Sequence, residues 1–77
     1  MDNAQLAQDL ETYANSFGRG YLKFYKANAI LGTLGLIPEI VHDEVRFLNY
    51  LKNCLEMEGF QGVDIELIMG WLYERLA

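Results

Sequence analysis

Glycine and proline divide this chain into four stretches, each about the length of a short helix. The breaks fall at residues 18–20, 35–38 and 59–62. Within each stretch, apolar residues recur three or four positions apart, which is the spacing of one face of an α-helix. Short helices joined by tight turns bury such faces against one another. We therefore predict an all-α fold, a compact bundle of about four short helices, as a single domain over residues 1–77.

The first and last predicted helices are amphipathic. The first begins at a cap, Asp2 or Asn3, and ends near residue 18. The last begins at Asp64 as N-cap, with Val63 and Ile68 forming a hydrophobic staple. Their predicted core residues are Leu6, Leu10, Tyr13, Ala14 and Phe17 in the first, and Ile65, Ile68, Met69, Leu72 and Leu76 in the last.

The second predicted helix runs from about Gly20 to Leu34 and is apolar on two sides. A helix of this kind is central in a fold or lies in an interface. Gly35 suits the left-handed position after its end, with Leu36 folding back on Leu31.

The third predicted helix begins at Pro38, whose fixed φ suits the first turn. It ends before Gly59 in a Schellman motif, in which Phe60 contacts Leu55. Its predicted apolar half consists of Ile40, Val41, Val45, Phe47, Leu48, Leu51, Cys54 and Leu55.

The charge of the chain argues against two classes of partner. The net charge is −5, and because the first 26 residues are balanced, the excess acid lies from residue 27 onward. Negative charge disfavours nucleic acid and anionic membranes, so we expect neither direct nucleic-acid binding nor membrane binding. A last helix with Asp64, Glu66 and Glu74 also has the wrong charge for a DNA recognition helix. One cysteine and a start without a basic signal sequence lead us to expect a cytoplasmic location.

Residues with catalytic chemistry are few. Cys54 lies on an apolar face without an activating base, and His42, on the same predicted helix, is too distant to serve as one. Glu39 and His42 form a Glu-x-x-His pair, which is half of a carboxylate-bridged metal site, but the sequence holds no second copy. We therefore expect no enzyme activity, no catalytic residue, no metal and no cofactor.

A basic stripe is expected on the second helix. Arg19, Lys23 and Lys26 stand four and three residues apart, with aromatic residues between them. The favoured interpretation is a solvated face that pairs with Asp9 and Glu11 of the first helix. The alternative is a binding site for a protein partner, with nucleic acid a distant third.

Leu67 and Trp71 are the most unusual feature of the last helix. At 100° per residue they point away from its core stripe and form one patch, beside Arg75. A tryptophan outside the core stripe is typical of an interface. The alternative is a helix that is sandwiched in the bundle and buries both of its sides.

These features predict a non-enzymatic protein–protein interaction module, either a regulatory or an adaptor subunit, and a homodimer in the simplest case. The predicted partner-binding residues are Leu67, Trp71, Arg75, Arg19, Lys23 and Lys26. Two alternatives stay open. One is a small acidic inhibitor of a nucleic-acid-binding protein, of the kind that phages or mobile elements encode. The other is a metal- or ligand-binding bundle that uses Glu39 and His42.

Overall fold

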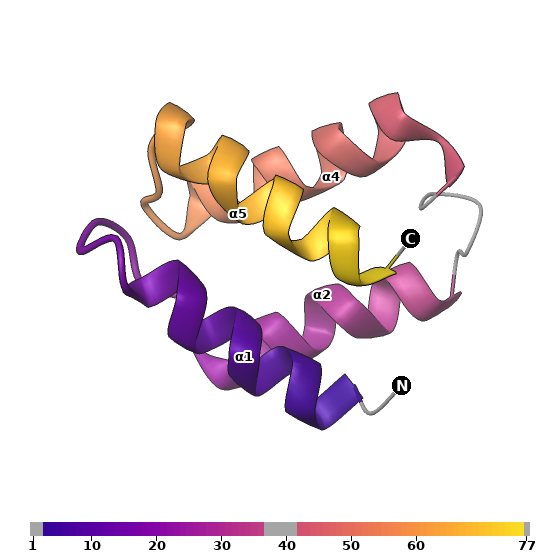
Figure 1. Cartoon of the computed structure of the whole chain (residues 1–77), viewed down its shortest axis with the longest axis horizontal. Coiled ribbons are helices and arrows are strands. Elements are labelled where there is room, and N and C mark those ends of the chain that lie inside the picture. Colours follow the sequence, from indigo (N-terminus) through magenta and orange to yellow (C-terminus); the bar gives the residue numbers. More distant parts are fainter. Residues whose placement is uncertain (1–2, 37–41, 77) are drawn as a thin grey trace.

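Four helices account for most of the chain in the computed structural model, which describes residues 3–36 and 42–76. They are α1 (Asn3–Asn15), α2 (Phe24–Leu36), α4 (Glu44–Met57) and α5 (Gly62–Leu76). The described residues contain no strand. Consecutive helices run in opposite directions, α1 packs against α2, and α5 packs against both α4 and α1 (Figure 1). The predicted all-α bundle is confirmed.

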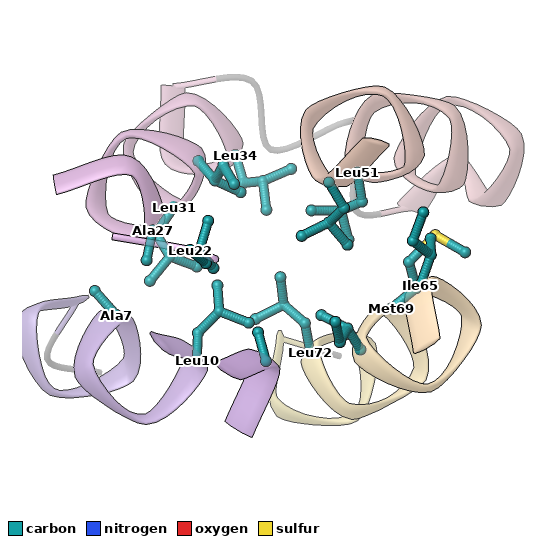
Figure 2. Close-up of a cluster of buried hydrophobic side chains, with 14 of the residues drawn as sticks. Ala7, Leu10, Leu22, Ala27, Leu31, Leu34, Leu51, Ile65, Met69 and Leu72 are labelled. Carbon is teal, nitrogen blue, oxygen red and sulfur yellow. The ribbon is translucent and has the colours of Figure 1, made fainter. Parts of the chain in front are cut away.

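The core lies between the four helices, each of which sends side chains into its centre (Figure 2). No polar or charged residue among those described is buried. The predicted core residues of α1 and α5 are confirmed as buried, except that Tyr13, Phe17 and Leu76 lie partly buried at its edge. The buried residues are Leu6, Ala7, Leu10, Ala14, Leu22, Ala27, Ile30, Leu31, Leu34, Phe47, Leu51, Leu55, Phe60, Ile65, Ile68, Met69 and Leu72.

The turn between α1 and α2 packs against the turn between α4 and α5. Gly20, with φ +76°, lies so close to Phe60 that a Cβ built on it would stand 2.7 Å from the phenyl ring. Next to this contact, the Tyr21 N–H donates to the Glu58 carbonyl at 3.1 Å. Both turns lie at the same end of the bundle (Figure 1). This contact ties the two helical hairpins together at that end.

The predicted start of the second helix at Gly20 is wrong, because α2 begins at Phe24. The Leu22 N–H donates to Asn15 Oδ1 at 2.7 Å, and Asn15 Nδ2 donates to the Leu22 carbonyl at 2.9 Å. With the Tyr21 N–H bonded to Glu58, the backbone groups of Tyr21 and Leu22 are hydrogen-bonded to other elements rather than within α2.

The predicted end of this helix is also wrong. The helix continues through Gly35 to Leu36, and Gly35 does not have the positive φ of a C′ residue. The side chain of Leu36 is outside the described residues, so its predicted contact with Leu31 is as well.

The third helix begins later than predicted, at Glu44. Asp43 is its N-cap, with φ −110° and ψ 97°, and its Oδ1 accepts a hydrogen bond from the Arg46 N–H at 3.2 Å. An extended residue at this position prevents one continuous helix from Pro38. Residues 37–41, which include Pro38, Glu39, Ile40 and Val41, are outside the described residues. Val45, which was predicted to lie on the apolar half of this helix, is exposed.

The end of α4 confirms the predicted Schellman motif. Gly59 has φ +90°, its N–H donates to the Glu56 carbonyl, and the Phe60 N–H donates to the Leu55 carbonyl at 3.1 Å. Both Phe60 and Leu55 are buried, as the motif requires of its hydrophobic pair.

The start of α5 differs from the predicted cap. The helix begins at Gly62, and the Gln61 carbonyl accepts the Ile65 N–H at 2.8 Å. Asp64 therefore lies within the first turn, where its negative charge interacts favourably with the positive end of the helix dipole. Val63 is 73% exposed, so it forms no hydrophobic staple with Ile68.

We expect Asn15→Ala to lower the free energy of unfolding by about 1–3 kcal/mol, because both backbone groups of Leu22 lose their partner. Urea unfolding followed by circular dichroism measures this change. Asn53→Ala, at an exposed position of α4, is the control and should change stability by less than about 0.5 kcal/mol. Equal effects of the two variants would show that Asn15 does not hold the turn.

Candidate protein-interaction surface

Trp71 lies at the contact between α1 and α5. Its ring stacks on Tyr13 of α1, with 5.0 Å between ring centroids and 9° between ring planes. Tyr13 in turn makes an edge contact with Phe17 at 5.2 Å. Trp71 is partly buried and packs against the edge of the core. The Trp71 side chain therefore lies outside the central core, but one side of it packs against Tyr13 of α1.

Arg75 holds Trp71 from within the same helix. Its Cζ lies 3.9 Å from the centroid of the Trp71 ring, and its Nη1 donates to the Trp71 carbonyl at 2.9 Å. Such a cation–π contact stabilises the orientation of both side chains. The ring is thus fixed by one residue from α1 and one from α5, which limits the rotamers it can adopt.

Leu67 extends this patch one turn toward the start of α5. Its side chain is 49% exposed. A shallow hollow of about 280 Å³ separates it from α1. The structure thus brings Leu67, Trp71 and Arg75 together on one surface, as the sequence predicts. The hollow is lined by Tyr13, Glu66, Leu67, Gly70, Trp71 and Glu74.

A second hollow, of about 430 Å³, lies on the other side of α5, against α4. Tyr73 forms part of its wall and makes an edge contact with buried Phe47 at 5.4 Å between ring centroids. The hollow is lined by Glu44, Leu48, Glu66, Met69, Gly70 and Tyr73. This hollow was not predicted from the sequence; Gly70, a glycine in the middle of the predicted last helix, is the feature that could have indicated it.

A third hollow, of about 530 Å³, lies nearer the turn between α4 and α5. Lys52 and Glu56 stand on its wall, 3.9 Å apart, and form an exposed ion pair. Because this pair balances its own charge, the third hollow lacks the purely acidic rim of the other two.

The predicted basic stripe is not a stripe on one helix. Arg19 lies in the turn before α2, where its Nη1 donates to Gln61 Oε1 at 2.9 Å. Lys23 precedes α2, and its carbonyl accepts the Ala27 N–H at 3.0 Å. Only Lys26 lies within the helix. The prediction is wrong because residues 19–23 are not helical.

The expected pairing of this stripe with α1 is also absent. Asp9 accepts a hydrogen bond from Gln5 at 3.0 Å, and the ion pair in the described part of the chain is Lys52 with Glu56. Three exposed aromatic residues lie between the basic residues in the sequence, namely Tyr21, Phe24 and Tyr25.

Tyr50 and Cys54 of α4 lie one helical turn apart, and Tyr50 interacts both with Cys54 and with Thr33 of α2. Burial raises the pKa of the Tyr50 phenol and the Cys54 thiol raises it further, whereas a hydrogen bond with Thr33 lowers it. The phenol therefore stays protonated at neutral pH and cannot serve as a base for the half-buried thiol.

His42 is not on the helix that carries Cys54, because it precedes the Asp43 cap; the prediction of a shared helix is wrong. Glu39, its predicted metal partner, is outside the described residues. Within residues 3–36 and 42–76, no three His, Cys, Asp or Glu side chains are grouped as a metal site would require.

Comparison of the chain with protein-family models, with curated proteins and with solved structures finds no match. Among the described helices, none is both long enough and apolar enough to cross a membrane.

Proposed function

We propose that this chain is a non-enzymatic protein-interaction module, a regulatory or adaptor subunit that binds its partner through the outer surface of α5 around Leu67 and Trp71. The observation that carries the proposal is the half-exposed Leu67 beside a tryptophan ring held by Tyr13 and Arg75. Aromatic and arginine side chains contribute most of the energy in many interfaces. A ring that is already held in place loses little conformational entropy on binding.

A second copy of the chain is the first partner to test, since a small bundle with exposed apolar side chains most simply covers them in a homodimer. The exposed aromatic residues beside Lys23 and Lys26 are the second candidate surface. The two surfaces are on different helices, so variants can separate them.

A small acidic inhibitor of a nucleic-acid-binding protein is the second candidate function. The glutamates that line the hollows beside α5, Glu44, Glu66 and Glu74, favour it. Competition with nucleic acid distinguishes the two functions, because such an inhibitor and nucleic acid would exclude each other from the partner, whereas an adaptor need not compete; raised ionic strength weakens acidic contacts in either case.

We expect Leu67→Glu to weaken self-association or partner binding about 30-fold, which corresponds to about 2 kcal/mol, while the chain stays helical. Sedimentation of the purified chain measures self-association. Quantitative recovery of bound proteins from an extract of the source cell measures partner binding. Leu67 is the residue to change because Trp71→Glu would also remove the contact with Tyr13.

Met57→Glu is the matched control, because it adds the same charge at an apolar side chain of α4 that is 78% exposed. Lys23→Glu with Lys26→Glu tests the second surface. If binding survives Leu67→Glu and is lost in the lysine variant, the contact surface is the second one. If all variants bind like the unmodified chain, both proposed surfaces are refuted; an unmodified chain that neither self-associates nor binds a protein would refute the proposed function.

A further inference from the structure

The middle of α5 has a hollow on either side. Gly70 lines both the hollow against α1 and the hollow against α4, and so does Glu66. A Cβ added to Gly70 would meet no atom within 4 Å, so packing within the chain does not require a glycine there. Glycine inside a helix costs about 0.5–1 kcal/mol relative to alanine. The lack of a side chain leaves a low point on the helix surface between the two hollows.

The lining of these hollows combines apolar side chains with exposed glutamates, which are called here their acidic edge. Leu48, Met69 and Tyr73 supply apolar surface on the α4 side. Glu44 and Glu66 stand on that side, and Glu66 and Glu74 on the other. Neither lining contains a lysine or arginine among the described residues.

We infer that the two hollows with Gly70 between them, together called here the groove of α5, bind an amphipathic helix of a partner protein that carries apolar side chains on one face and lysine or arginine on its flanks. The inference rests on the proposed function, since it names the partner chemistry of the same helix. Charge complementarity selects the partner: basic side chains would meet Glu44 and Glu66, while an apolar side chain enters between Leu48 and Tyr73.

Two other occupants fit less well. An extended segment that adds a strand needs an open sheet edge, and the described residues form no strand. A second copy of this chain, the first partner to test above, would bring Glu44, Glu66 and Glu74 against the same glutamates if the hollows met about a two-fold axis, so it complements them less well than a basic helix does. A helix instead presents side chains three and four residues apart, which can enter the hollows on either side of Gly70.

The test uses a synthetic peptide with leucine along one helix face and lysine on the flanks. Binding is measured by the fluorescence of Trp71, the single tryptophan of the chain, and by calorimetry. A peptide of the same composition in scrambled order is the control for charge alone. We expect the ordered peptide to bind at least about tenfold more tightly than the scrambled one, because only the former presents an apolar face.

Two variants probe the groove. Glu44→Gln with Glu66→Gln should weaken binding about tenfold at low salt and less at high salt, because it removes the acidic edge. Gly70→Leu should weaken binding about tenfold by filling the low point, at a position with open space. Matched controls are Glu11→Gln on α1 and Gly32→Leu on α2, where an added Cβ also meets nothing; both should bind like the unmodified chain.

Equal binding of ordered and scrambled peptides, or unchanged binding by Gly70→Leu, would overturn the inference. So would self-association that Gly70→Leu abolishes, because the occupant would then be a second copy. If Leu67→Glu abolishes binding of the natural partner and Gly70→Leu does not, the groove is refuted but the proposed function is not. If both variants still bind the natural partner, the α5 contact surface of the proposed function is refuted as well.

Discussion

Gly20→Ala is expected to lower the free energy of unfolding by about 3 kcal/mol or more, a large part of the about 4–12 kcal/mol expected for a chain of this length. An alanine Cβ would stand 2.7 Å from the ring of Phe60 and 2.8 Å from its backbone nitrogen. The ring can shift, but the nitrogen donates to the Leu55 carbonyl and cannot move without breaking the end of α4. The positive φ adds about 1–2 kcal/mol for any L-residue.

Gly18→Ala separates these two costs. Gly18 has φ +79°, close to the value at Gly20, but a Cβ on it would meet nothing within 4 Å. Its replacement should therefore show the backbone cost alone, about 1–2 kcal/mol. Urea unfolding of both variants, followed by circular dichroism and by Trp71 fluorescence, measures the difference. Equal losses would mean that Gly20 and Phe60 are not in close contact.

Phe47→Ala is expected to cost about 3–5 kcal/mol, because it leaves a cavity at a fully buried position. The edge contact of Phe47 with Tyr73 of α5 is lost as well. Phe47→Leu keeps most of the volume and should cost less than about 1.5 kcal/mol.

The matched control for Phe47 is Phe24→Ala, at the start of α2, where the side chain is 40% exposed. Its truncation should cost about 1 kcal/mol, because less apolar surface is removed from contact. Thermal and urea unfolding give the comparison. If Phe47→Ala lost no more stability than Phe24→Ala, α4 would not pack against the core as described.

Part of the candidate surface could be predicted from the sequence, because it depends on residues of one helix. Leu67, Trp71 and Arg75 are four residues apart, so helical geometry alone places them side by side. The stack on Tyr13 could not be predicted in the same way. It requires α1 to lie against α5, and no spacing within either helix encodes that neighbour.

The basic residues illustrate the opposite case. Arg19, Lys23 and Lys26 have the spacing of a helical stripe, and the pattern would hold if residues 19–26 were all helical. The turn instead forms hydrogen bonds with Asn15 at the end of α1, seven residues before Leu22, and with the carbonyl of Glu58, which is distant in sequence. These hydrogen bonds satisfy backbone groups that a helix would otherwise use, so tertiary contacts override the local pattern.

The sequence by itself determined the helical fold, the stripes of α1 and α5 that enter the core, and the end of α4 at Gly59. These depend on interactions within a few residues, namely side-chain periodicity and the left-handed conformation that glycine adopts at no steric cost. Only the tertiary structure decided where α2 begins, how Trp71 is held, and that hollows lie on both sides of Gly70. Each of these depends on groups from different helices, whose approach is set by the packing of the whole core.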